Sequence, residues 1–188
     1  ETTPKINTPQ STVLEPTSIY GISKLFGEQL CNYYYTKHKL DIRSIRLPGL
    51  ITIKKFSGGG TSDYTVEMIL SAIARKNYLC FVKQETKMPL MAMEDAIDAI
   101  IRLMLAPKKN ISIRTSYNLG SMSFSAHELE KEIKKYVPNF TCTYESDYRQ
   151  IIADSWPDSI DDSIANKDWG WQAKIQLKQL VNDLIFQK

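Results

Sequence analysis

Residues 18–34, SIYGISKLFGEQLCNYY, predict the long helix around which the rest of the fold can be placed. Ser18 can cap a helix, and the apolar side chains after it recur at intervals of three and four residues. They are Ile22, Leu25, Phe26, Leu30, Tyr33 and Tyr34. We therefore expect an amphipathic helix that begins after Ser18 and frays near residues 37–39.

Outward from this helix, short apolar strands alternate with further helices. Strands are expected at residues 41–47, 78–82, 90–93, 116–119 and 141–144, the first of them ending at Pro48-Gly49. Helices are expected after a cap at residues 61–63, at 94–105, from Ser125 to about Val137, and around 177–184. This alternation predicts an α/β protein.

Composition narrows the class of protein. The 188 residues hold 24 basic and 21 acidic side chains, and the resulting net charge of +3 is too balanced to indicate a nucleic-acid partner. No apolar run approaches the roughly 20 residues of a membrane span. Cys31, Cys80 and Cys142 form no CxxC pair, and the other soft ligands are His38 and His127. We expect no metal site, and reduced thiols in an intracellular protein.

A phenol and an ammonium group stand four residues apart at Tyr20 and Lys24, which places them on one face of the helix. A tyrosine hydroxyl is ordinarily a poor base at neutral pH, and a neighbouring lysine favours its phenolate. Such a pair can take a proton from a substrate hydroxyl. The same spacing recurs at residues 33/37 and 35/39, so spacing alone does not separate a catalytic pair from a packed tyrosine beside a solvated lysine.

Six short stretches together resemble a known family. They are residues 19–24 (IYGISK), 46–51 (RLPGLI), 58–64 (GGGTSDY), 121–124 (SMSF), 152–157 (IADSWP) and 167–171 (KDWGW). They resemble the extended short-chain dehydrogenases and sugar-nucleotide epimerases, and most closely the short-chain type of L-threonine 3-dehydrogenase. The resemblance runs from about residue 15 to 185.

The resemblance implies the C-terminal part of an NAD(P)-binding, Rossmann-like, doubly wound parallel sheet with a small α/β substrate-binding lobe. Residues 1–55 would end the Rossmann-like domain. Residues 56–188 would form mainly the lobe, with about 88–120 returning to the sheet. In that lobe Trp156, Trp169 and Trp171 would be core anchors.

The implied reaction is oxidation of L-threonine by NAD+ to 2-amino-3-oxobutyrate, in a mitochondrion or in a bacterial cytoplasm. Tyr20 would be the general base, and Lys24 would stabilise its phenolate and bind the cofactor ribose. Several other positions would contact the ligands. They are Pro48, Gly49 and Leu50 beside the nicotinamide, Gly60 and Thr61 at the amino-acid end of the substrate, and Asp154 as a counter-charge for the ammonium.

The resemblance also implies a homodimer formed through the helix that carries Tyr20. Leu25, Gln29 and Tyr33 are assigned to the dimer face. Ile22, Phe26 and Leu30 are assigned to the inward face. Both assignments are expectations from the pattern alone.

Parts of the family pattern lie outside these residues. The Gly-rich nucleotide turn, the acidic residue that binds adenosine and the catalytic Ser or Thr before the dyad are not found. The triple glycine at 58–60 lacks the GxGxxG spacing. We therefore expect a chain that is poorly soluble or partly disordered and inactive on its own. Two other functions stay open: a UDP-sugar epimerase or dehydratase on the same fold, and a non-catalytic remnant that acts by association.

Overall fold

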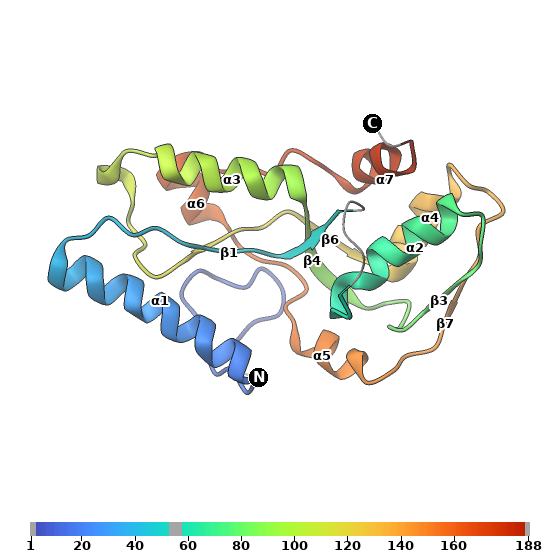
Figure 1. The fold of residues 1–188 in the computed structure, drawn as a ribbon, viewed down its shortest axis with the longest axis horizontal. Coiled ribbons are helices and arrows are strands. Elements are labelled where there is room, and N and C mark those ends of the chain that lie inside the picture. Colours follow the sequence, from blue (N-terminus) through green and yellow to red (C-terminus); the bar gives the residue numbers. More distant parts are fainter. Residues whose placement is uncertain (1–2, 53–57, 187–188) are drawn as a thin grey trace.

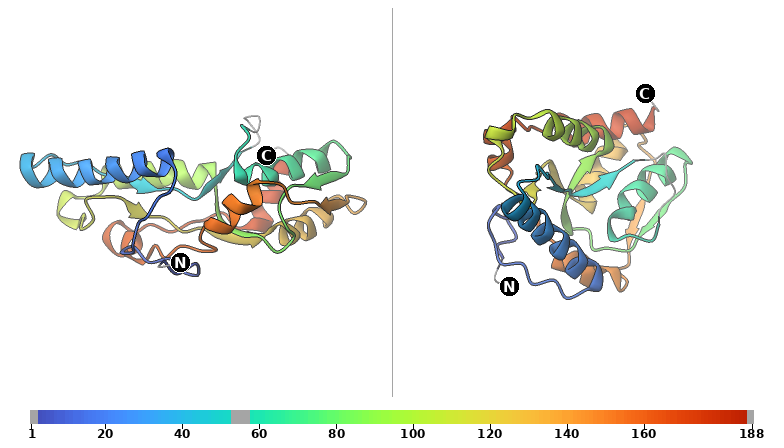
Figure 2. Two further views of the ribbon diagram at one scale, coloured as in Figure 1. Left: turned by 90° about the horizontal axis from the view of Figure 1, so that it is seen from below. Right: turned by 60° about the vertical axis from the view of Figure 1, so that its left-hand side comes forward.

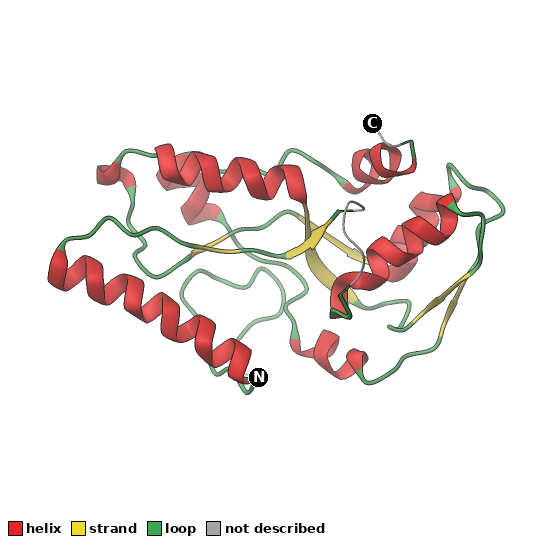
Figure 3. Cartoon of the chain, in the orientation of Figure 1, coloured by secondary structure: helices red, strands yellow, loops and turns green. Residues whose placement is uncertain are grey.

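The computed structural model describes residues 3–52 and 58–186, whose arrangement is shown in Figure 1. Seven α-helices in this part of the chain are α1 (Ile19–His38), α2 (Tyr64–Ile73), α3 (Met93–Leu105), α4 (Ala126–Lys134), α5 (Arg149–Ser155), α6 (Ser163–Trp169) and α7 (Leu177–Ile185). Short 3-10 turns are η1 (Thr61–Asp63) and η2 (Lys108–Asn110). Figure 3 shows long loops before α1 and between α6 and α7.

The strands are short and mostly parallel, as expected for an α/β protein. β1 (Ile45–Arg46) runs parallel to β5 (Tyr117–Asn118). β4 (Lys87–Ala92) lies between β2 (Gly49–Ile51), which is parallel to it, and β6 (Met122–Ser125), which is antiparallel. β3 (Tyr78–Cys80) and β7 (Cys142–Tyr144) form a separate parallel ribbon.

The strand expected at residues 41–47 is wrong in extent. Only residues 45–46 pair as a strand, and the chain re-enters a sheet at Gly49 instead of leaving it. Pro48 has no N–H to donate to a ladder, so it divides one predicted strand into two. The first half pairs with β5 and the second with β4.

Two hydrophobic cores lie under these elements. The larger joins α2, α4 and α7 to β3, β4 and β6, and the smaller joins α3, α6 and β5. Trp156 packs against the larger core. Trp171 is fully buried in the smaller core with Trp169 packed beside it.

Helix α1 and helix α3 flank the β1 and β5 strands on opposite sides, as both Figure 1 and Figure 2 show. Helix α1 contains no buried residue in the described chain. The inward assignment of Ile22, Phe26 and Leu30 is wrong, because they are 49%, 62% and 37% exposed. Leu25, assigned to the outer face, is half-buried.

Several predicted helices needed adjustment. Helix α4 begins at the Ser125–Glu128 capping box as expected, but it ends at Lys134, before Val137. Helices α5 and α6 and strand β6 were not predicted. Each short helix has seven residues, too few to display a clear apolar period.

Within the described residues, none of the helices combines the length and apolar character required to cross a membrane.

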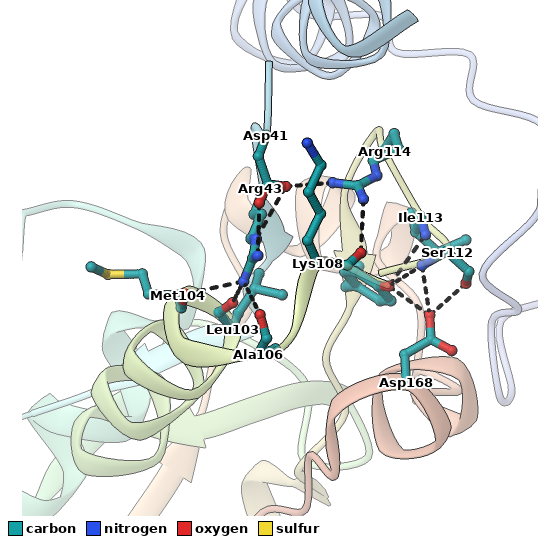
Figure 4. Close-up of polar contacts among 11 residues, drawn as sticks. Asp41, Arg43, Leu103, Met104, Ala106, Lys108, Ser112, Ile113, Arg114 and Asp168 are labelled. Carbon is teal, nitrogen blue, oxygen red and sulfur yellow. Dashed lines mark hydrogen bonds and ion pairs between the residues drawn. The ribbon is translucent and has the colours of Figure 1, made fainter. Parts of the chain in front are cut away.

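A charged cluster ties the far end of the β1–β5 sheet to α3 (Figure 4). One Arg43 nitrogen, Nη1, donates to the carbonyl oxygens of Leu103 and Ala106 at 2.5 and 2.7 Å, which caps the end of α3. Asp41 accepts from Arg43 at 2.8 Å and from Arg114 at 2.7 Å. The hydrogen bond from Arg43 is the main reason that the pKa of Asp41 falls to about 2, and Arg114 adds to it.

We predict that Asp41→Asn destabilises the chain by about 1 kcal/mol at pH 7, a value discounted for solvent screening. The folded-state pKa of about 2 lies below the ordinary value of 3.8, so the Asp41 contribution is present above pH 3.8 and disappears as the pH falls towards 2. Urea unfolding at pH 7 and at pH 2 measures both effects. An equal difference between variant and parent at the two pH values would contradict this account.

Candidate functional site

The start of α1 presents the two groups of the predicted dyad together. Ser18 caps the helix as expected, because its Oγ accepts from the Gly21 N–H at 3.1 Å. Tyr20 is 72% exposed. Lys24 Nζ lies 5.2 Å from the centroid of the Tyr20 ring. Phenol and ammonium therefore share one open face at the first turns of the helix.

The other two copies of this spacing are used differently. The Tyr33 ring packs edge-to-face on Tyr34 at 5.4 Å. The Tyr35 ring lies under the Arg114 guanidinium, 4.0 Å from its central carbon. Lys39 is the left-handed residue that ends the helix. Both tyrosines take part in ring packing, which distinguishes them from Tyr20.

The loop before α1 approaches the helix closely at Gly21. A Cβ atom at this position would lie 2.7 Å from the Cβ of Pro16, so a larger residue would push the loop away. The Ser23 hydroxyl donates to the Tyr20 carbonyl at 2.7 Å. The two small residues that follow Tyr20 therefore have structural roles: Gly21 leaves room for the preceding loop, and Ser23 bonds the Tyr20 carbonyl.

The predicted cofactor and substrate segments meet at Gly49. A Cβ there would lie 3.2 Å from the Cβ of Ser62 and 2.9 Å from Leu90 Cδ2. Pro48 and Gly49 are buried and Leu50 is half-buried between these neighbours. The end of β1, the start of β2 and the turn η1 are thus brought to one place.

The glycine loop is organised by Asp63, a residue that the sequence suggested only as a helix cap. Asp63 Oδ2 accepts from the Gly60 N–H at 2.8 Å, and the Asp63 N–H donates to the Gly60 carbonyl at 3.1 Å. A carboxylate of this chain therefore already occupies the Gly60 N–H. In this conformation that N–H is not available to a substrate carboxylate. Thr61 is 8% exposed, so little of it faces outward.

Helix α5 packs beside η1 and carries Asp154. Its carboxylate accepts from Gln150 Nε2 at 2.7 Å. Gln150 is itself buried and accepts the Lys83 N–H at 2.7 Å, so its amide is held in one orientation. Asp154 is an exposed carboxylate on a fixed support. Figure 1 shows the beginning of α1, helix α5 and the beginning of α2 at the same side of the molecule.

The sequence does not reveal the partners that fasten the dyad helix, although Arg46 lies in the RLPG stretch that carries part of the family resemblance. Arg46 makes a two-pronged ion pair with Glu28, with N···O distances of 2.8 and 2.6 Å. Its third nitrogen, Nη1, donates to Asn118 Oδ1 at 3.0 Å. Gln10 completes the network by accepting the Asn118 N–H at 2.7 Å. The i, i+4 spacing from Lys24 to Glu28 was the available signal, but it does not reveal the partner.

This α/β fold, with an exposed Tyr20/Lys24 pair at the start of α1 and a glycine turn beside β2, defines the class of protein. Residues 1–120 match the family described as NAD dependent epimerase/dehydratase. The chain belongs to this family. It spans just over half the length of its curated relatives: an epimerase/dehydratase of Staphylococcus haemolyticus is 48% identical over 94% of this chain and 56% of its own.

Solved structures resemble this chain more specifically than the family model does. The GalE-like L-threonine dehydrogenase of Cupriavidus necator, in its apo form, is 49% identical with a TM-score of 0.96, over 98% of this chain and 67% of its own. The L-threonine dehydrogenase of Clostridium difficile is 41% identical with a TM-score of 0.96, over 98% of this chain and 58% of its own. The L-threonine 3-dehydrogenase of Trypanosoma brucei is 36% identical with a TM-score of 0.95, over 99% of this chain and 58% of its own. The predicted Rossmann-like fold and the resemblance to these dehydrogenases are confirmed. A nucleoside-diphosphate-sugar epimerase of Agrobacterium tumefaciens, at 16% identity and a TM-score of 0.82 over 96% of this chain and 54% of its own, shares the fold.

We predict that Glu28→Gln loosens α1, because it removes the charge that holds Arg46. The free energy needed to open α1 locally should fall by about 2 kcal/mol, as for loss of a hydrogen bond to a partly buried charge. Hydrogen exchange of α1 amides measures it. The control is Asp98→Asn, which breaks the more exposed ion pairs of Asp98 with Arg102 and Lys174 and should cost less than about 1 kcal/mol. Equal effects of the two substitutions would contradict the role given to Glu28.

Proposed function

We propose that this chain provides the proton-transfer and substrate-binding part of an NAD-dependent dehydrogenase that oxidises L-threonine to 2-amino-3-oxobutyrate. The observation that carries the proposal is the exposed Tyr20/Lys24 pair at the capped start of α1. The likeness to L-threonine dehydrogenases over nearly the whole chain supports the choice of substrate.

Each residue has a chemical role in this proposal. Tyr20, as phenolate, accepts the proton of the threonine hydroxyl while the carbon is oxidised. The Lys24 ammonium stabilises the negative charge on the phenolate, since it lies on the same face of the helix. Asp154 and Asp63 offer carboxylates on the lobe side, and the substrate ammonium would pair with one of them. Thr61 and Gly60 shape the turn that borders it.

Some of the residues that would contact a nicotinamide cofactor are present in this chain. Among the described residues, no carboxylate pairs with Lys24, so its ammonium is available to a ribose hydroxyl. Pro48, Gly49 and Leu50 would border the nicotinamide ring. When bound, NAD+ accepts the hydride from the substrate carbon. A Gly-rich phosphate turn would have to come from residues outside these 188.

The turn that follows the triple glycine favours an amino acid over a sugar nucleotide. Residues 58–74 contain no lysine or arginine. A nucleotide diphosphate is usually held by basic groups or by free backbone N–H groups. Here Asp63 places a negative charge at the turn and takes the Gly60 N–H. An ammonium group suits this position better than a diphosphate does.

We predict that Tyr20→Phe lowers kcat for threonine-dependent NADH formation by roughly 100-fold to 10,000-fold in the full-length protein that contains these residues, because it removes the general base. Tyr33→Phe is the matched control, since Tyr33 has the same spacing to a lysine but packs on Tyr34. It should leave kcat within about 2-fold of the parent, as expected for a change remote from the reacting atoms. Turnover of a UDP-sugar with none of threonine would overturn the proposal. Loss of activity in both variants would remove the special role of Tyr20.

We also propose that the outward face of α1 is a homodimer interface. The face consists of Ile19, Ile22, Phe26, Leu30 and Tyr33, each between 37% and 83% exposed. A contiguous stripe of exposed apolar side chains usually marks an interaction site. A metagenome L-threonine 3-dehydrogenase that is 49% identical to this chain is described as monomeric, so sedimentation of the full-length protein is decisive. A two-copy mass that falls to one copy on Phe26→Glu supports the proposal, and a one-copy mass of the parent overturns it.

A further inference from the structure

Two cysteines lie on neighbouring strands of the β3–β7 ribbon. The register pairs Tyr78 with Cys142 and Cys80 with Tyr144. Paired residues of parallel strands point to the same face, and so do residues two apart on one strand. Cys80 and Cys142 are therefore diagonal neighbours on one face of the ribbon. Both are free thiols.

The two thiols have unequal surroundings. Cys80 is fully buried, whereas Cys142 is half-buried and its sulfur lies 3.6 Å from the Thr143 carbonyl oxygen. A hydrogen bond from the Cys80 thiol is the main reason that the pKa of Cys142 is lowered from its ordinary value. The same contact, together with burial, raises the pKa of Cys80. Of the two, Cys142 is the one that can be reached from solvent, and the directions of the two pKa shifts favour its thiolate.

Other titratable groups on this face are occupied elsewhere. The Tyr144 hydroxyl donates to Glu130 Oε2 at 2.7 Å and the Tyr78 hydroxyl donates to Glu67 Oε2 at 2.8 Å. The Glu130 carboxylate also accepts from Lys134 at 2.6 Å. Glu130 therefore has a cationic partner, and Glu67 is hydrogen-bonded to a phenol. The thiol pair is the nucleophilic part of the cluster.

We propose that Cys142 and Cys80 form an oxidation site for hydroperoxides, in which Cys142 reacts first and Cys80 resolves it as a disulfide. The Cys142 sulfur attacks one oxygen of the hydroperoxide, so that an S–O bond forms, the O–O bond breaks, and an alcohol or water leaves after taking a proton. The Cys80 sulfur then displaces hydroxide from Cys142, which leaves as water with the Cys80 proton. Two thiols and one hydroperoxide give one disulfide, one alcohol or water, and one water.

Formation of this bond requires the two strands of the ribbon to shift. Diagonal neighbours must move closer to reach disulfide geometry. Each strand has three residues, and in the described chain β3 and β7 pair only with each other, so a shift of the ribbon leaves the other sheets paired. The bond would tie the segment that follows α2 to the segment that leads into α5.

The test is controlled oxidation of the chain with hydrogen peroxide, followed by mass spectrometry without reduction. The intact mass should fall by about 2 Da, the two hydrogens lost in one disulfide. A crosslinked peptide should contain Cys80 and Cys142. Cys31, also half-buried, is the internal control and should remain open to iodoacetamide. Oxidation of Cys142 to a sulfinic acid while Cys80 stays alkylatable would overturn the proposal, as would reaction of Cys31 before Cys142.

Two variants separate the roles of the thiols. Cys80→Ala should leave a sulfenic acid on Cys142 that dimedone traps. Cys142→Ala should leave Cys80 as an unreacted thiol, because it is fully buried. Equal dimedone labelling in both variants would contradict the assigned order. The measurement on the parent chain stands by itself if either variant fails to fold.

Discussion

Glu28 and Arg46 face each other between α1 and the β1 strand, and their side chains make two parallel hydrogen bonds of 2.6 and 2.8 Å. This contact matters because α1 has no buried residue in the described chain and gains little from hydrophobic packing. Arg46 also reaches Asn118 on β5, so one guanidinium joins the helix to both strands of the sheet. Since Glu28 follows Lys24 by one turn and Tyr20 by two, this ion pair sets the position of the dyad. At the other end of the helix, the Arg114 guanidinium lies over the Tyr35 ring in a cation–π contact.

The remaining parts of the site are held by other carboxylates and amides. Asp63 closes the turn after the triple glycine, and buried Gln150 orients Asp154. These supports lie on the larger core, whereas the dyad helix is attached to the strands of the smaller one. The segments expected to contact the cofactor and the substrate lie next to each other at the junction of β2 and η1. The apolar faces of α1 and α3 are exposed in this chain.

The sequence predicted those features that depend on local pattern. Helices α1 and α3, the Ser18 cap and the Ser125–Glu128 capping box follow from short-range spacing. It misjudged the features that depend on distant partners. Pro48 was expected to end a strand, but Leu90 and its neighbours pair with the residues beyond it. On α1, Ile22, Phe26 and Leu30 are exposed against expectation and Leu25 is half-buried, whereas Gln29 and Tyr33 are exposed as expected. An apolar stripe alone does not show which of its residues meet the core of their own chain.

The site residues also separate into those that a local pattern predicts and those whose contacts depend on other parts of the chain. Tyr20 and Lys24 were predicted from their spacing and from the family resemblance, and the structure brings them together. The occupied Gly60 N–H was not predictable, since it depends on the rotamer of Asp63.

In the proposed reaction, Tyr20 is the base that takes the proton from threonine. A crystal structure of the full-length protein with NAD+ and a threonine analogue tests it most directly. We expect the Tyr20 hydroxyl oxygen within about 3 Å of the ligand hydroxyl oxygen. A ligand bound away from Tyr20, with its hydroxyl against another titratable side chain, would contradict the account.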